Sequence, residues 1–210
     1  MAGNAAVLED GTLLSKLDLR LERIERFLAL IGGIAVFMLM VLAVVSVGGR
    51  NLLNKPLPGY VDWIEMAMPL IAFMGVSYTH RSGGHIRMDI LVGRLKGRWL
   101  WGAELLTALV TLALIMLLVW GSWAHFERSI DFNVPLWSRD STIDIKLPLW
   151  PAKLLVPFMF SVLCARMALH VWGYARAFVQ GAEYPIAVPL ALSAAEQAAE
   201  EARHVSALDT

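Results

Sequence analysis

FLALIGGIAVFMLMVLAVVSVGG, residues 27–49, runs for 23 positions without one charged side chain. A helix rises about 1.5 Å per residue, so about 20 residues cross a hydrocarbon core of about 30 Å. A second run, from Leu105 to Ala124, adds 20 uncharged residues. A helix in a soluble core carries polar side chains on its outer face. Both runs therefore predict transmembrane helices.

The composition of the whole chain agrees with a membrane protein. Apolar residues make up 58% of the 210 residues, and the formal net charge is zero. Soluble globular domains contain about 45–50% apolar residues. Because the charges balance, nothing indicates a polyanionic partner, and we expect no nucleic acid to bind.

Two further apolar stretches complete an expected all-α membrane protein with four transmembrane helices. The fourth is the weakest, because Lys153, Arg166 and His170 interrupt it. Lys153 at its start can extend its charged end to the interface, which makes it an expected interfacial anchor. The predicted spans are about 27–49, 60–79, 101–124 and 150–175.

An amphipathic helix is expected before span one, over residues 15–28. Its apolar positions recur at helical spacing, and Arg23 and Arg26 are candidate anchors to the lipid surface. The alternative is a plain extension of span one. Ser15 and Asp18 have the spacing of a capping box, which predicts a helix start at Ser15. The apolar positions are Leu17, Leu21, Ile24 and Leu28.

A second interfacial helix is expected between spans two and three, ending near Trp99. Tryptophans at the other end of the bundle, Trp137 and Trp150, are further expected interfacial anchors. Residues 1–14 predict a disordered N-terminus, 15–180 the membrane domain, and 181–210 a soluble tail with a short helix. Residues 27–49 predict a retained anchor, because 26 residues of mixed charge precede them.

The flanking Lys and Arg residues predict the orientation. Nine lie before span one or between spans two and three, against five in the other two loops. Both termini are therefore expected in the cytoplasm, in a multi-pass protein of the bacterial inner membrane.

No cofactor, metal or catalytic residue is expected. The single cysteine, Cys164, excludes an intramolecular disulfide, and no phosphate-binding G-x-x-x-x-G-K-[ST] motif is present. A b-type haem needs two imidazoles that face each other between helices. His80 and His85 fall at the end of span two and His125 at the far end of span three, so we expect no two histidines to face each other.

Asp62 and Glu65 are the acids at membrane depth. An intramembrane acid suggests a functional site, and a proton relay is the sharpest version. Both residues lie in the first two turns of span two, where a helix N-terminus favours carboxylates by about 0.3–1 kcal/mol. We therefore expect interfacial or subunit-pairing carboxylates, with the relay as the alternative.

The stretch RNLLNKPLPGYVDWIEMAMPLIAFMGVSYTHRSGGHIRMDIL, residues 50–91, resembles a known family. An arginine ends span one, W-x-E opens span two, and G-G-H-I-R-x-D follows it. This pattern, with PLWPAKLLVPF at the start of span four, is similar to the small membrane subunit of tripartite ATP-independent periplasmic (TRAP) transporters. The residues of the resemblance are Arg50, Asp62, Trp63, Glu65, Gly75, Gly83, Gly84, His85, Arg87 and Asp89.

The resemblance implies a division of labour. A large multi-span permease subunit holds the solute and coupling-ion sites, and a periplasmic substrate-binding protein delivers the solute, commonly an organic acid. The small subunit is then a non-catalytic scaffold in a sodium-coupled importer, surrounded by membrane lipid. Two alternatives remain at this point: a membrane anchor of a redox complex of b-type cytochrome kind, and a self-sufficient small transporter.

Overall fold

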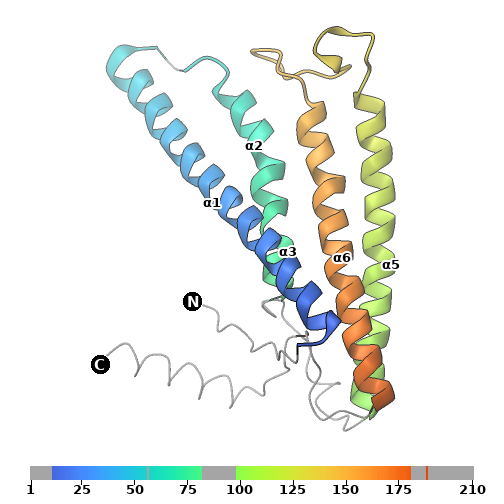
Figure 1. Ribbon diagram of the computed structural model, residues 1–210. Coiled ribbons are helices and arrows are strands. Elements are labelled where there is room, and N and C mark those ends of the chain that lie inside the picture. The colour runs from blue at the N-terminus through green and yellow to red at the C-terminus, as the bar shows by residue number, and fades with distance from the viewer. Residues whose placement is uncertain (1–10, 56, 82–97, 181–187, 189–210) are drawn as a thin grey trace, which may run out of the picture. The chain divides into compact units, whose positions relative to one another are not determined.

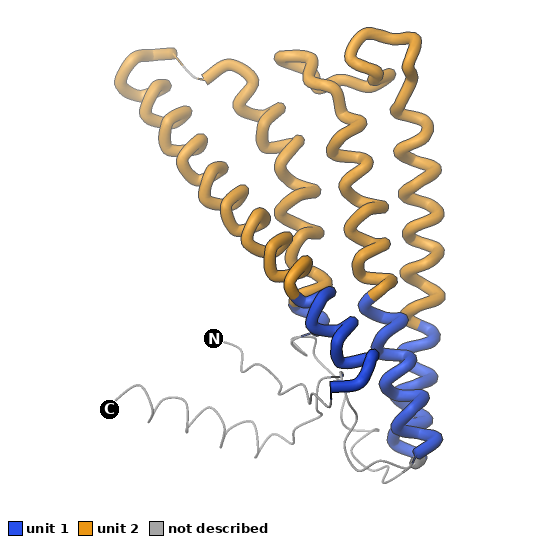
Figure 2. The backbone as a smooth tube through the Cα atoms, viewed as in Figure 1, with its two compact units in different colours: residues 1–22, 79–110, 166–210 blue, residues 23–78, 111–165 orange. Residues whose placement is uncertain are grey.

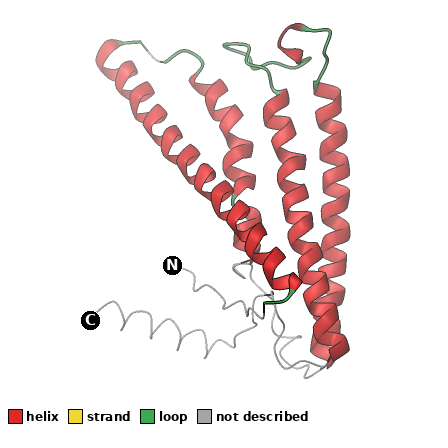
Figure 3. Ribbon diagram, viewed as in Figure 1, coloured by secondary structure: helices red, strands yellow, loops and turns green. Residues whose placement is uncertain are grey.

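The computed structural model describes residues 11–55, 57–81, 98–180 and 188. Within them the regular structure is helical, apart from two isolated bridges between single residues (Figures 1 and 3). The elements are α1 (Leu13–Leu53), α2 (Tyr60–Met74), α3 (Val76–Arg81), α5 (Arg98–Ser129), the 3-10 helix η1 (Pro135–Trp137) and α6 (Trp150–Gln180). The expected all-α class is confirmed for these residues.

Three of the described helices are long and apolar enough to cross a membrane. They are α1, α6 and almost all of α5, and they contain the predicted spans 27–49, 150–175 and 101–124. In α6, 33% of the most apolar window is buried, against 11% in α1 and in α5. The apolar surfaces of α1 and α5 are therefore left for lipid or for another protein.

The predicted second span, 60–79, is divided at Gly75 into α2 and α3. Alone, the 15 residues of α2 reach about 22 Å, which is short of the hydrocarbon thickness. Gly75 keeps a right-handed conformation, with φ −90° and ψ −14°, so the chain continues in nearly the same winding.

The amphipathic segment 15–28 is the first part of α1, which continues through span one without interruption. A helix that lies in the interface must turn before it crosses, so the continuous helix fits the alternative of an extension of span one. The expected capping box is wrong, because α1 begins at Leu13 and Ser15 already lies inside it. The buried face of α1 carries Asp18 and Glu25, whereas Ile24 is 51% exposed.

The described helices contribute to two compact units (Figure 2). Unit 2 contains residues 23–78 and 111–165, and its apolar core joins α1, α2 and α6 through Leu28, Met74 and Met159. Unit 1 contains residues 1–22, 79–110 and 166–210, and α5 packs on α6 there, with the rings of Trp101 and Tyr174 stacked at 6.4 Å.

Several predictions lie outside the described residues. They are the disordered N-terminus up to residue 10, the interfacial helix between spans two and three, and the helix in the C-terminal tail.

Candidate functional site

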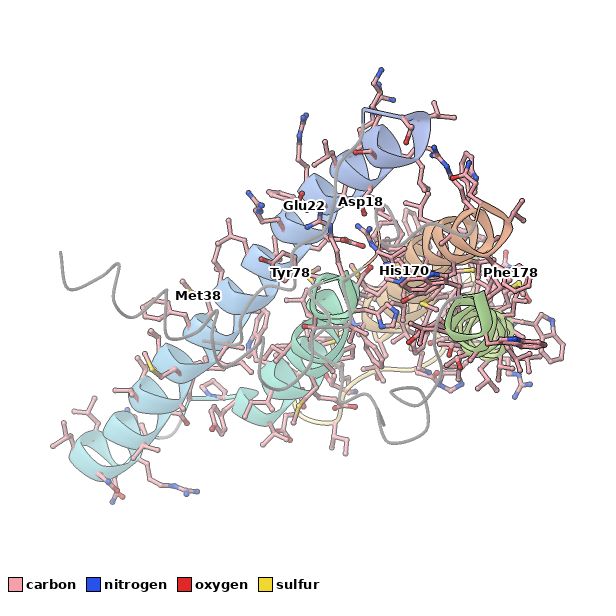
Figure 4. The ribbon with its side chains drawn as sticks, turned by 90° about the horizontal axis from the view of Figure 1, so that it is seen from below. Asp18, Glu22, Met38, Tyr78, His170 and Phe178 are labelled. Carbon is pink, nitrogen blue, oxygen red and sulfur yellow. The ribbon has the colours of Figure 1, made fainter. Side chains whose placement is uncertain are left out.

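A cluster of buried charges lies in unit 1 and ties three helices together. Asp18 of α1 accepts hydrogen bonds from Arg166 of α6 and from Arg81 of α3, the latter at 2.8 Å from Nη2 to Oδ2. Glu22, one turn further along α1, contacts the same Arg81 nitrogen at 3.3 Å. We call Asp18, Glu22, Arg81 and Arg166 the ionic cluster. Figure 4 shows Asp18 on the side of α1 that faces α6. His170 lies on α6 in the same region.

Burial makes this cluster energetically important. The side chains of Arg166 and Asp18 are 0% and 1% exposed, and that of Arg81 is 14% exposed. A charge removed from water is tolerated only with opposite charges and hydrogen bonds around it. Two arginines face two carboxylates here, so the four formal charges cancel. The ionic cluster can therefore fix helix positions, and its carboxylates are engaged by cations of the same chain.

Two histidines meet beside the ionic cluster, which corrects the expectation that no two would face each other. The rings of His80 on α3 and His170 on α6 stack with centroids 5.2 Å apart and an angle of 26° between their planes. In the sequence His80 lies at the end of the predicted span two and His170 within span four, and the packing of α3 on α6 brings them together. Rings stacked directly on each other do not clasp a porphyrin between them, so the haem alternative gains nothing from this pair.

A second buried acid, Glu25 of α1, lies in unit 2. The hydroxyl of Ser77 in α3 donates to its Oε1 at 2.5 Å, and the two residues are 5% and 0% exposed, respectively. The neighbouring Gly32 lies close to Met74, since an added Cβ would come within 3.2 Å of the Met74 Cβ. These contacts hold the region of the Gly75 break against α1.

Asp62, at the start of α2, ties the loop of residues 130–149 to α2 within unit 2. Its carboxylate accepts the backbone N–H groups of Asp144 at 3.1 Å and Ile145 at 2.7 Å. The side chain is 2% exposed. Gly59, just before α2, has φ +69° and lies directly against the Ile145 side chain. The carboxylate is thus occupied by backbone donors of the same chain.

The 130–149 loop is itself held by charge-assisted hydrogen bonds. Asp140 accepts Lys153 Nζ at 2.5 Å and Ser129 Oγ at 3.0 Å, and these two donors hold the pKa of Asp140 below its usual range. The Asn133 backbone N–H and the Arg139 side chain lower the pKa of Asp131 in the same way. Donors that stabilise the ionised form favour loss of the proton. Both carboxylates therefore hold the loop in their charged form.

The predicted site residues on α1 and α2 have different surroundings. Arg50 lies in the last turn of α1 and is exposed, and Gly75 lies at the break between α2 and α3. Trp63 is 49% exposed. Glu65 is exposed, whereas Asp62 is buried, so the two acids have different surroundings although they are one turn apart on α2. Outside the described residues lie Gly83, Gly84, His85, Arg87 and Asp89.

The predicted anchors are mostly exposed. Arg23 and Arg26 are exposed on α1, Trp99 is 78% exposed, and Trp137 is 54% exposed. Trp150, half-buried, donates from its indole N–H to the Leu136 carbonyl at 3.0 Å. Lys153 pairs with Asp140, as described above.

Residues 39–177 match the family model for tripartite ATP-independent periplasmic transporters, DctQ component. The match covers more than half of the 210 residues, from the second half of α1 to near the end of α6. The chain belongs to this family. No curated protein sequence matches the chain significantly.

The resemblance to the small TRAP subunit is thus confirmed. The DctQ component is part of a transporter, and three described helices are long and apolar enough to cross a membrane, so the chain is a multi-pass membrane protein. The family works within tripartite transporters that also contain a large permease and a binding protein.

The sequence pattern did not reveal the central residues of this DctQ component's ionic cluster. Asp18 was predicted as part of a capping box, and Arg166 only as an interruption of the fourth span. A signal was present, because a cation inside an apolar span needs an acidic partner at the same depth. Choosing Asp18 among the acids required knowing which face of α1 packs against α6.

Proposed function

We propose that this chain is the non-catalytic scaffold subunit of a TRAP-type secondary importer. It packs against the large permease and supports ion-coupled, binding-protein-dependent uptake of a small organic solute, with organic acids as the expected class. The family match carries this proposal. Sodium is the expected coupling ion, on the resemblance alone.

The chemistry of the buried charges supports a scaffold role. A carboxylate that binds a solute or an ion must be available for exchange during each transport cycle. Asp18 is held by Arg166 and Arg81, and Asp62 by two backbone N–H groups of the 130–149 loop. These acids stabilise the chain itself, which suits a subunit that keeps one shape while another subunit moves.

In this proposal α2 and α3 together form the second of four spans. Their 22 residues, from Tyr60 to Arg81, reach about 33 Å at a helical rise, enough for the hydrocarbon core. Both termini then face the cytoplasm, and the 130–149 loop faces the periplasm. We propose that four residues of the family resemblance support the fold and the contact with the large subunit: Trp63, Glu65, Arg87 and Asp89. The predicted aromatic and basic anchors are proposed to lie at the lipid interface.

The test is uptake into proteoliposomes with the binding protein present, comparing the large permease alone, this chain alone, and the two together. The proposal expects uptake only from the pair, and unchanged solute affinity of the isolated binding protein. Flux from this chain alone would favour the self-sufficient transporter. Full-rate uptake by the large permease alone would exclude a required scaffold.

A further inference from the structure

An outward stripe on α2 combines apolar side chains with one acid. Val61, Glu65, Met68 and Ala72 lie at helical spacing on one side of α2, and all four are exposed. Val61 and Met68 are 62% and 59% exposed. Met74, on the opposite side of α2, is buried in unit 2, and Asp62, which lies beside the stripe one turn before Glu65, is also buried. The stripe therefore points away from the described neighbours of α2.

Glu65 lies further along α2 than Asp62, the residue that binds the 130–149 loop. Asp62 accepts backbone N–H groups of the 130–149 loop, which marks the level where non-helical chain meets α2. Glu65 is three residues further on, about 4.5 Å along the helix axis. Its neighbours in the stripe are apolar. Facing lipid, a carboxylate at this level would lose hydration without gaining any partner.

The backbone carbonyl of Glu65 is a second hydrogen-bond acceptor. Pro69 follows Glu65 by four positions, and proline has no N–H to donate to the carbonyl oxygen of Glu65. Glu65 therefore carries two hydrogen-bond acceptors, its carboxylate and a backbone carbonyl that lacks the usual donor four residues later. Among the described residues, no hydrogen bond or ion pair engages the Glu65 side chain. Inside a membrane both acceptors require donors.

We infer that this stripe is covered by a membrane helix of the large permease that presents a lysine or arginine side chain to Glu65. A cation matches the charge of the carboxylate, and its several N–H groups can also reach the carbonyl that Pro69 leaves without a helical donor. The apolar stem of such a side chain fits beside Val61 and Met68. This inference rests on the proposed function and names the chemistry of the partner at that contact.

The first experiment measures how much large permease co-purifies with the affinity-tagged chain from membranes that contain both. Glu65→Lys places like charges together and should lower recovery by about tenfold or more, as loss of a buried interfacial ion pair does. Glu65→Gln keeps the size and should lower it less. Glu127→Lys, at an exposed acid in the last turn of α5, is the matched control and should leave recovery unchanged.

The second experiment places a photoreactive amino acid at Met68, with Leu114 on the exposed side of α5 as the comparison. The inference expects a crosslink from position 68 to one helix of the large permease. It also expects that helix to carry a basic residue whose exchange for glutamate restores co-purification of the large permease with the Glu65→Lys chain. A crosslink from position 68 to a second copy of this chain would overturn the inference. A crosslink to lipid alone, together with unchanged co-purification of the large permease in Glu65→Lys, would also overturn it. If the wild-type chain recovers no large permease, the proposed function itself fails.

Discussion

Asp18 and Arg166 form an ion pair in which both side chains are buried, although 148 residues separate them along the chain. The pair joins the first turns of α1 to the second half of α6. Arg81 binds the second carboxylate oxygen of Asp18 and adds α3 to the same contact. A single carboxylate therefore fixes three helices in unit 1.

Asp18→Asn should strongly destabilise the protein. The change removes the negative charge that Arg166 and Arg81 bind, and breaking the fully buried pair with Arg166 costs about 3–5 kcal/mol. Glu22→Gln is the matched control, because Glu22 also contacts Arg81 but is 14% exposed, and it should cost about 1 kcal/mol. Equilibrium unfolding in mixed micelles measures both. Equal losses for the two variants would contradict the central role of Asp18.

Asp62→Ala should release the 130–149 loop. It removes the acceptor for the N–H groups of Asp144 and Ile145, and a hydrogen bond to a charged group contributes about 1.5–3 kcal/mol. Hydrogen exchange at these two amides should accelerate by about tenfold or more. Asp144→Ala, which removes an exposed carboxylate from the same loop, should leave the amide of Ile145 protected. Unchanged protection in Asp62→Ala would show that another contact holds the loop.

Gly59→Ala should destabilise the start of α2. Gly59 has φ +69°, where a residue with a Cβ costs about 1–2 kcal/mol. The added Cβ would also lie 2.6 Å from Cδ1 of Ile145, which would have to move. Gly33→Ala is the comparison, because a Cβ added at Gly33 in α1 would meet no atom within 4 Å. This change should leave the stability of the protein unchanged or raise it by up to about 1 kcal/mol. Thermal unfolding of the two variants provides the comparison, and equal shifts would rule out the steric argument.

The contact between Asp140 and Lys153 should depend on pH only in strong acid. Hydrogen bonds from Lys153 and Ser129 hold the pKa of Asp140 below its usual range. A lowered pKa in the folded state adds stability that is complete above the ordinary aspartate value, about 3.9, and is lost as the pH falls through the lower folded value. Carboxyl NMR titration should find this low pKa.

Lys153→Met should bring the pKa of Asp140 back toward its ordinary value. Lys146→Met is the control, because Lys146 is exposed in the same loop and no described ion pair joins it to Asp140. An Asp140 pKa that is insensitive to Lys153 would mean that Ser129 and His125 determine the shift.

The sequence by itself determined the class of protein. Uninterrupted apolar runs of 23 and 20 residues admit few structures other than membrane helices, because every backbone polar group in lipid must be bonded within the helix. The W-x-E and G-G-H-I-R-x-D patterns were enough to indicate the family, which the match over residues 39–177 confirms. Both signals are local in the sequence and need no knowledge of packing.

Only the tertiary structure decided which charged residues are partners. Asp18, Glu25 and Asp62 look alike in the sequence, yet Asp18 binds two arginines, Glu25 binds the Ser77 hydroxyl, and Asp62 binds loop amides. The apolar stripe predicted on α1 included Ile24, which is exposed, while the acids beside it are buried. In a membrane protein an apolar face can be directed to lipid as well as to protein, so hydrophobic periodicity does not show which side of a helix is buried. Contacts between distant parts of the chain settle that question, and with it the roles of Asp18 and Arg166.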